Sequence, residues 1–182
     1  TICRNFENEV EFLKNMYKNE EFKHDNMSKL WKIPVCYDSV FGIDLEWISK
    51  QNNLSIKEII ALHSQAIYTV YFIGFLPGFL YLGGLNKSLF IPRKSTPRSI
   101  VKKGAVAIGG HQTGVYPNES PGGWNVIGNS PVSFFDVKKD IPCFAKPGDK
   151  ILFEPVSLKS YYEINKLLER GNYQLENEVI YD

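Results

Sequence analysis

Cysteine is scarce in this sequence, and its spacing excludes two common ways of stabilising a small fold. The 182 residues contain three cysteines, Cys3, Cys36 and Cys143, with no C-x-x-C pair. An odd number of widely separated cysteines argues against a disulfide framework and against a structural zinc site. A chain of this length buries enough apolar surface to fold without either, so we expect buried free thiols in a cytoplasmic protein.

Long apolar runs and familiar catalytic motifs are also missing. The longest apolar stretch, residues 67–82, is interrupted by Gly74, Pro77 and Gly78, and the N-terminal residues lack the features of a signal peptide. The sequence contains no P-loop, no G-x-G-x-x-G, no H-E-x-x-H and no G-x-S-x-G motif. We therefore expect no membrane span, no self-contained nucleotide site of a familiar kind and no metal ligated by this chain.

Basic residues and turn-forming residues are concentrated in one part of the chain. The net charge is +1, but residues 74–148 contain nine Lys and Arg against three Asp and Glu. The same residues include 12 of the 14 glycines and 8 of the 10 prolines. This region favours a β-rich structure with an anionic ligand or an acidic partner surface, while a solvated basic loop is the alternative for the lysines alone. We expect neither nucleic acid nor a membrane as a partner.

Hydrophobic periodicity predicts helices on both sides of that region. The expected helices cover residues 6–17, 44–51, 56–65 and 157–170. The third has the clearest start, because Ser55 and Glu58 have the spacing of a capping box. Runs of β-branched and aromatic residues predict strands at residues 32–37, 67–75, 89–91, 99–101, 105–108, 125–127, 133–135 and 150–153. Many short strands separated by turns predict a closed or partly closed β-barrel.

Two arginines are candidates for binding an anion. Arg93 follows Pro92 and Arg98 follows Pro97, and the rigid proline lowers the entropy lost when the side chain is held in place. A guanidinium suits bidentate binding to a carboxylate or a phosphate. The alternative is structural pairing with an acidic residue elsewhere in the chain.

Neutral polar residues on glycine-rich backbone form a second group of candidates. Such groups orient a small polar ligand, and paired backbone N–H groups stabilise an oxyanion. The group comprises Gly109, Gly110, Gln112, Thr113, Tyr116, Ser120, Gly123 and Trp124. Trp124 can equally fill the interior of a barrel. His63, on the predicted third helix, is either a proton-transfer residue or a buried core histidine, and with His24 and His111 it lacks the spacing of metal ligands.

Residues 74–85, GFLPGFLYLGGL, combine glycine, proline and aromatic residues. Pro77, Gly78 and Tyr81 in this segment are candidates for ligand contact, because glycine allows the backbone to approach another group closely. A tight turn at the end of a strand is the alternative.

Four motifs, taken in order, resemble the bacterial PxpB/KipI family of the carboxyltransferase subdomain C and D type. They are GFLPGFLYLGGL, PRKSTPR, AIGGHQTGVYP and SPGGWNVIG, at residues 74–85, 92–98, 107–117 and 120–128. Members of this family are named as the B subunit of 5-oxoprolinase, as kinase A inhibitor KipI or as allophanate hydrolase subunit 1. The resemblance extends from about Ile33 to Pro155.

The resemblance implies an α+β fold with a mostly β core. We expect a small N-terminal α+β module at residues 1–66, a cyclophilin-like β-barrel at residues 67–156, and a C-terminal helix and tail at residues 157–182. The segment before Ile33 is shorter than the usual N-terminal module of the family. We therefore expect that module to be incomplete in this chain.

The resemblance also implies a role as the B subunit of an ATP-dependent 5-oxoprolinase complex, which cleaves 5-oxo-L-proline to L-glutamate. The implied partners are the PxpC/KipA-type and LamB/YcsF-type subunits of that complex, either of which can carry the ATP site. The chain is then an enzyme subunit that is inactive alone. The alternatives are a KipI-type inhibitor that binds a sensor histidine kinase, and an allophanate hydrolase-like or urea carboxylase-like subunit.

This interpretation assigns roles to the candidate residues. The expected catalytic residues are Arg98, Gln112, Tyr116 and His63, and the expected substrate-binding residues are Arg93, Gly109, Gly110, Thr113, Ser120, Gly123, Trp124, Pro77, Gly78 and Tyr81. The two arginines bind a carboxylate or a phosphate, and the polar group orients the lactam. The hypothesis requires these side chains to converge on one cleft, and it predicts that Arg98→Ala abolishes activity without unfolding the protein.

Overall fold

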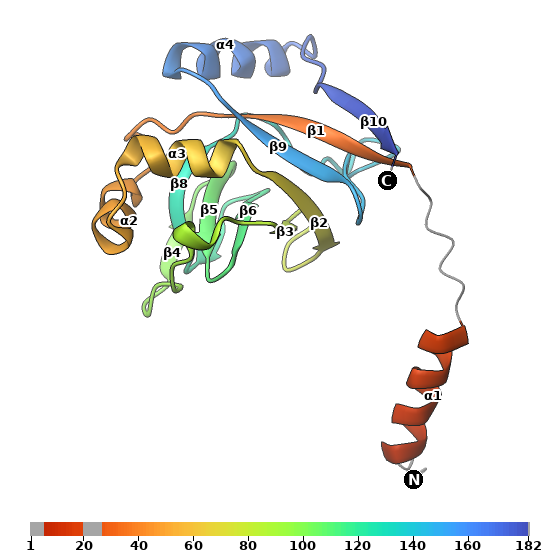
Figure 1. Cartoon of the computed structure of the whole chain (residues 1–182). Helices are drawn as coiled ribbons and strands as arrows, with labels where there is room; N and C mark the ends of the chain where they lie inside the picture. Colours follow the sequence, from red (N-terminus) through yellow and green to blue (C-terminus); the bar gives the residue numbers. More distant parts are fainter. Residues whose placement is uncertain (1–5, 20–26, 182) are drawn as a thin grey trace.

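The computed structural model describes residues 6–19 and 27–181 of the chain. Expectations about Cys3 and His24 therefore lie outside the described residues. The helices and strands form a mixed α+β arrangement with a mostly β core (Figure 1), as the sequence predicts. None of the described helices combines the length and the apolar character that a bilayer span requires.

Eight strands form one mixed sheet. In spatial order they are β10 (Asn177–Tyr181), β1 (Met27–Val35), β9 (Lys150–Pro155), β2 (Ile67–Ile73), β3 (Leu80–Gly83), β6 (Gln112–Val115), β5 (Ala105–Gly109) and β8 (Asn125–Asn129). β1 and β9 run parallel, and the other neighbouring pairs run antiparallel. Because β9 pairs with both β1 and β2, the sheet joins strands from the early, middle and late parts of the chain.

The sheet curves back on itself without a continuous ladder that closes it (Figure 1). Its two sides meet at one residue pair, where the backbones of Cys36 and Asn129 exchange two N–H···O=C hydrogen bonds of 2.9 Å. A separate two-stranded sheet contains β4 (Arg98–Val101) and β7 (Ser120–Gly122). Of the two expected forms, closed and partly closed, the described strands do not show the closed one.

Three helices lie next to the sheet. They are α2 (Leu45–Asn52), α3 (Ile56–Ser64) and α4 (Leu158–Glu169). Local capping signals account for the start of two of them, α3 and α4. The capping box predicted for α3 is present, because the Glu58 N–H donates to Ser55 Oγ and the Ser55 N–H donates to the Glu58 carboxylate. At α4 the hydroxyl of Ser157 accepts the N–H of Ser160, and Gly171 follows the helix at φ 70°.

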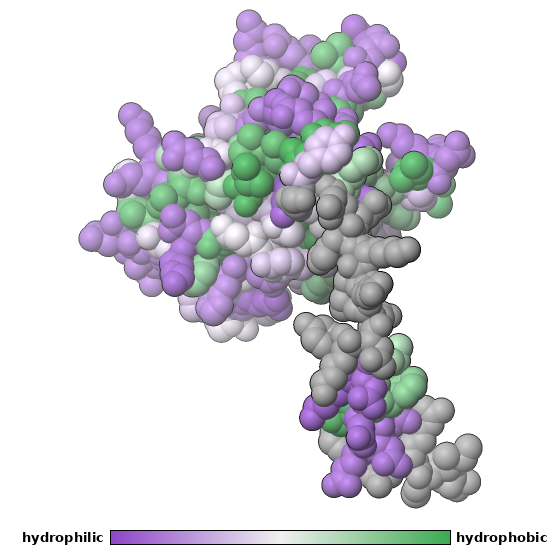
Figure 2. Space-filling view, turned by 45° about the vertical axis from the view of Figure 1, so that its right-hand side comes forward, coloured by the Kyte–Doolittle hydropathy of each residue, from purple (hydrophilic) through white to green (hydrophobic). Residues whose placement is uncertain are grey.

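The first helix, α1 (Phe6–Asn19), lies apart from the other described elements (Figure 1). It confirms the helix predicted at residues 6–17. Phe12, Leu13 and Met16 on this helix are exposed, and Figure 2 shows apolar atoms on its surface. None of its described side chains belongs to the core.

The core has two parts. In the larger one, strands β1, β2 and β9 pack with α2 and α3 around fully buried side chains such as Ile33 and Ile59. The smaller one surrounds Phe79, Tyr116 and Trp124, which come from the glycine-rich middle of the chain. Burying an aliphatic or aromatic side chain of this size contributes about 1.5–3 kcal/mol. The smaller core is the one that shapes the site.

Three strand predictions need correction. Residues 89–91 include the end of a 3₁₀ helix, η1 (Lys87–Leu89), which Asn86 caps by accepting the Ser88 N–H, so the backbone turns there. Residues 133–135 are irregular with a bend at Phe134, and the Ser133 hydroxyl donates to the Phe135 carbonyl. The strand predicted at residues 67–75 ends at Ile73 and exposes part of one face, because a bulge next to Val70 shifts its register.

Four observed strands, β3, β6, β7 and β10, are not predicted from the sequence. Glycine and polar residues within the first three mask the alternation that identifies a strand. β10 is exposed along most of its length and is held by pairing with β1. Its structure depends on that distant partner.

Candidate functional site

A pocket of about 310 Å³ opens above the smaller core. Its lining residues are Phe75, Phe79, Tyr81, Arg93, Lys94, Pro97, Tyr116, Pro121, Gly122, Gly123 and Trp124. They come from the β2–β3 connection and β3, from the loop before β4, from the position after β6, and from β7 with the β7–β8 connection. Each of the four sequence motifs therefore contributes to one concave surface.

Aromatic rings form the floor of this pocket. Phe79 lies edge-to-face against Tyr116 and Trp124, with ring centroids 5.4 and 5.5 Å apart. Glycines make this close packing possible, because a Cβ built on Gly109 would lie 2.6 Å from the Trp124 indole and one on Gly122 would lie 2.3 Å from the Tyr116 oxygen. Gly109, a predicted substrate-binding residue, is thus required by packing under the indole.

Hydrogen bonds hold the backbone on both sides of Arg93. On one side, Asn125 Nδ2 donates to the carbonyl of Pro92 at 3.0 Å. On the other side, the Lys94 N–H donates to the carbonyl of Gly123 at 2.7 Å. The Arg93 guanidinium lies over the Trp124 indole, 5.4 Å from the ring centroid. In the described part of the chain, no acidic side chain forms an ion pair with it. The pocket therefore presents a positioned cation whose charge these residues leave unneutralised.

Arg98 has a different environment, although it also follows a proline. Its Nη2 donates to Asp44 Oδ1 at 2.6 Å, and the Lys94 ammonium lies 2.9 Å from the same oxygen. The second oxygen of Asp44 accepts the Val126 N–H at 2.7 Å. Burial acts to raise the pKa of Asp44, but the hydrogen bonds from Arg98, Lys94 and Val126 outweigh it and hold that pKa below its usual range. The geometry thus gives Arg98 the structural pairing that was the alternative to anion binding.

Tyr116 connects the floor of the pocket to both arginines. Burial raises the pKa of its phenol, whereas a hydrogen bond from the backbone N–H of Trp124 and the charges of Arg93 and Arg98 act in the opposite direction. Because burial dominates, the phenol stays protonated at neutral pH. Tyr116 is therefore suited to donate a hydrogen bond to a ligand oxygen.

His63 is fully buried outside the pocket, in the larger core. Its Nε2 lies 2.8 Å from Thr113 Oγ1, and that hydroxyl donates to the Ala107 carbonyl, so Nε2 carries the proton. Nδ1 then accepts the hydroxyl of Tyr37 at 2.7 Å. Burial lowers the pKa of His63 to about 3. The ring is neutral and fully hydrogen-bonded, which is the core-histidine alternative, and Thr113 is its buried partner instead of a ligand contact.

The pocket brings together five of the predicted site residues. They are Tyr81, Arg93, Tyr116, Gly123 and Trp124. Gln112 and Ser120 do not line it. Gln112 lies at the end of the β5–β6 hairpin, opposite Gly109, and the Ser120 hydroxyl donates to the next carbonyl along the chain.

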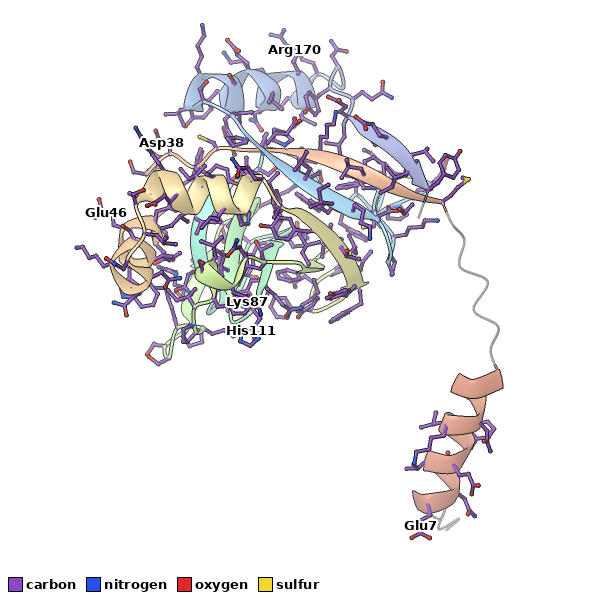
Figure 3. The ribbon with its side chains drawn as sticks, viewed as in Figure 1. Glu7, Asp38, Glu46, Lys87, His111 and Arg170 are labelled. Carbon is purple, nitrogen blue, oxygen red and sulfur yellow. The ribbon has the colours of Figure 1, made fainter. Side chains whose placement is uncertain are left out.

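Three further predicted residues shape the backbone around the pocket. Gly110, at φ 65°, exchanges backbone hydrogen bonds with Ile91 and so anchors the start of the Arg93 loop. Pro77 and Gly78 occupy the middle of a turn before β3, in which Gly78 has a φ of 82°. His111, which stacks on Phe90 with centroids 4.4 Å apart, lies at the outer tip of the neighbouring hairpin (Figure 3).

Some residues that build the site are not among the sequence candidates. Phe75 and Phe79 lie in the first motif, and their aromatic character between glycines is a signal that could have included them. Asp44 has no such signal, because 54 positions separate it from Arg98. Lys94 contacts the Asp44 carboxylate and the Trp47 indole.

Two other hollows lie near the pocket. Arg93 and Lys94 also border a broad groove of about 630 Å³ that passes Trp47. Arg98 borders a hollow of about 160 Å³ whose other walls include the exposed side chains of Ile43 and Ile100. Within residues 6–19 and 27–181, no group of three or more potential ligand side chains forms a candidate metal site.

A comparison with protein-family models assigns the class of protein to which this pocket and sheet belong. The family model described as "Carboxyltransferase domain, subdomain C and D" matches residues 3–145. The chain belongs to this family, and the resemblance drawn from the four motifs is confirmed.

Curated relatives of this chain are named as the B subunit of 5-oxoprolinase. The protein from Bacillus subtilis (strain 168) is 45% identical over 134 residues, which are 74% of this chain and 56% of the relative. The protein from Escherichia coli O157:H7 is 46% identical over 128 residues, which are 70% of this chain and 59% of the relative. The chain thus spans somewhat more than half the length of these relatives.

Solved structures show the same fold. A conserved uncharacterized protein from Pyrococcus horikoshii is 41% identical, with a TM-score of 0.71 over 85% of this chain and 66% of that chain. The urea carboxylase of Kluyveromyces lactis has a TM-score of 0.76 over 94% of this chain and 18% of that chain. At 20% identity this second likeness concerns the fold alone.

Proposed function

We propose that this chain acts as the B-type subunit of an ATP-dependent 5-oxoprolinase complex, and that its aromatic pocket binds 5-oxo-L-proline. The observation that carries the proposal is the Arg93 guanidinium, held over Trp124 at a pocket of about 310 Å³ without an acidic partner among the described residues. Two curated relatives at 45% and 46% identity have the corresponding name.

The pocket chemistry suits this substrate. A 5-oxoproline molecule has a carboxylate, a lactam amide and an apolar ring face. In the proposal Arg93 binds the carboxylate and the Tyr116 hydroxyl donates to the lactam oxygen, which is supported by both residues lining the pocket. The flat indole of Trp124 offers an apolar surface to the ring. An anion bound beside an aromatic wall is partly desolvated, so its pairing with the guanidinium is stronger than in water.

ATP supplies the energy in this proposal by converting the lactam oxygen into a phosphorylated leaving group. Transfer of the γ-phosphoryl group to the lactam oxygen releases ADP, and water then adds to the activated carbon. The C–N bond breaks, so the ring opens to an acyl phosphate, and a second water hydrolyses this acyl phosphate to L-glutamate and phosphate. The residues of this chain orient the lactam and stabilise the negative charge that develops on its oxygen. We place the ATP site on one of the two partners, the PxpC/KipA-type or the LamB/YcsF-type subunit.

The same proposal covers the architecture and the cellular context. The partly closed sheet with its Cys36–Asn129 link is the candidate for the cyclophilin-like barrel of the family. The module boundaries at residues 66 and 156, the assembly with the two partner subunits, and a cytoplasmic location belong to the proposal. The groove beside Arg93 leaves room for another subunit to complete the site.

Reconstitution with the PxpC/KipA-type and LamB/YcsF-type subunits tests the function. We expect ATP hydrolysis that depends on 5-oxo-L-proline, and a decrease in kcat/KM of about 30-fold for Arg93→Ala, equivalent to about 2 kcal/mol. Arg93 makes no ion pair in the described chain, so its removal should change the free energy of unfolding by less than about 0.5 kcal/mol.

Arg170→Ala is the matched control, because Arg170 is an exposed arginine at the end of α4, on the opposite side of the molecule from His111 (Figure 3). Its turnover should equal that of the wild type. Full activity of Arg93→Ala would contradict the proposed role of the pocket in substrate binding. Binding to a sensor histidine kinase without 5-oxo-L-proline turnover would contradict the enzyme function and support the alternative, a KipI-type inhibitor.

A further inference from the structure

Phe75 has an unusual backbone conformation at the mouth of the pocket. Its φ is 68°, in the left-handed region that bulky residues avoid. The Leu76 N–H donates to the Gly74 carbonyl at 2.8 Å across it, which defines a three-residue γ-turn. With a positive φ at its centre this is the rarer and more strained form of that turn.

The surrounding loop holds Phe75 in this conformation. The Phe79 N–H donates to the Leu76 carbonyl at 3.0 Å, and the Gly74 N–H donates to the Phe79 carbonyl at 3.1 Å. Gly78 is wedged against the chain that follows β8, where an added Cβ would lie 2.8 Å from the Phe134 carbonyl oxygen. Both ends of the γ-turn are therefore anchored, so the strain cannot relax by a shift of the loop.

Burial of the Phe75 ring does not explain the backbone strain. The side chain is 63% exposed, and its ring lies edge-to-face with Phe79 at a centroid distance of 5.6 Å. A glycine would adopt the left-handed conformation freely, and Gly74 stands one position earlier with an ordinary φ. The sequence thus places an exposed aromatic ring where backbone energetics favour glycine.

We propose that Phe75 is a ligand-positioning residue, whose ring is held at the pocket mouth to pack against the apolar face of a bound cyclic amide. This inference rests on the proposed function and names the surface that distinguishes a ring-shaped substrate from an open-chain amide. Strained residues of this kind persist where function requires their position. Phe75 lines the same pocket as Arg93 and Trp124, so one ligand can contact all three.

Three substitutions separate the ring from the strain. Phe75→Gly removes both, Phe75→Ala removes the ring and keeps the strain, and Phe75→Tyr keeps both. We expect the KM for 5-oxo-L-proline in the reconstituted complex to rise about tenfold for the Gly and Ala variants, with kcat nearly unchanged. The Tyr variant should retain the wild-type KM.

Thermal unfolding of the chain alone measures the backbone strain at Phe75 in the absence of any ligand. Phe75→Gly should raise the midpoint by about 2–4 °C, whereas Phe75→Ala should not raise it. Asn53→Gly is the matched control, because Asn53 has a φ of 53° at the end of α2 and does not line the pocket. Asn53→Gly should leave the KM unchanged. It should shift the unfolding midpoint by no more than about one degree, since asparagine tolerates this conformation.

The outcomes distinguish this inference from the proposed function. A wild-type KM in Phe75→Gly, together with substrate-dependent turnover, would overturn the positioning role and leave the function intact. A lower unfolding midpoint in Phe75→Gly would contradict the claim that the Phe75 backbone is strained. Absence of 5-oxo-L-proline turnover in the wild-type complex would overturn both the function and the inference.

Discussion

The open pocket around Arg93 and the buried polar sites around Arg98 and His63 contain similar residue types but differ in their partners. Arg93 lies over an indole and makes no ion pair in the described chain. Arg98 is bound to the buried carboxylate of Asp44, and both ring nitrogens of His63 are hydrogen-bonded in the core. Arg98 and His63 have partners that stabilise the fold, although Arg98 Nη1 is buried without a hydrogen-bond partner. Arg93 has no acidic partner among the described residues and can bind an anionic ligand.

The two kinds of site depend on one another. Asp44 holds Arg98 and Lys94, and the Lys94 backbone is tied to Gly123 next to Trp124. The buried carboxylate of Asp44, through the half-buried side chains of Lys94 and Arg98, therefore fixes the far end of the loop that presents Arg93. Rigid support of this kind reduces the entropy lost when a ligand binds. The comparison predicts that changes at the buried sites affect stability first, and changes at the pocket affect activity first.

The largest effect on stability is expected for Asp44→Ala. It leaves Arg98 and Lys94 without their acid and the buried Val126 N–H without its acceptor, so the free energy of unfolding should fall by about 3 kcal/mol. Urea denaturation measures this change. Glu46→Ala, an exposed acidic position nearby on α2 (Figure 3), should change it by less than about 0.5 kcal/mol. Equal effects of the two variants would contradict the anchoring role of Asp44.

The next effect concerns pH and His63. The folded pKa is about 3 against an ordinary value of 6.5, so above pH 6.5 the ring is neutral in both states. Between pH 6.5 and 3 the unfolded chain binds a proton that the folded chain does not. The contribution of His63 to the free energy of unfolding should therefore fall by about 1.4 kcal/mol per pH unit as the pH decreases through this range.

Chemical denaturation at about pH 7, 6 and 5 measures that slope. His63→Gln provides the comparison, because glutamine does not titrate and the variant should lose this part of the pH dependence, whatever its stability at neutral pH. A slope in His63→Gln as steep as in the wild type would show that other groups cause it.

The smallest of the three effects is expected for Arg98→Ala. Asp44 keeps Lys94 and the Val126 N–H in this variant, so the free energy of unfolding should fall by only about 1–2 kcal/mol. In an Asp44→Ala background the same substitution should add little, since the two residues act as a pair. Loss of activity with unchanged stability would instead support the direct anion-binding role that the sequence suggests for Arg98.

The clearest sequence predictions concern local structure. Ser55 and Glu58 predict the start of α3 because a capping box involves residues three positions apart. The clustering of glycine, proline and aromatic residues in 74–148 identifies the segment that builds the pocket, and the structure brings Arg93, Tyr116 and Trp124 together there. The strand predicted at residues 89–91 is wrong, and the sequence left open whether the sheet closes, because turn capping and sheet closure depend on contacts beyond the local pattern.

The sequence by itself determines the family, the helices with local caps and the four motifs that supply the pocket. Only the tertiary structure decides that Arg93 rather than Arg98 faces the pocket, that His63 is a neutral core residue, and that Phe75 has a left-handed backbone. The physical reason is distance along the chain. The partners of Arg98 and His63, Asp44 and Thr113, lie 54 and 50 residues away, and burial of such pairs is a property of the packed molecule.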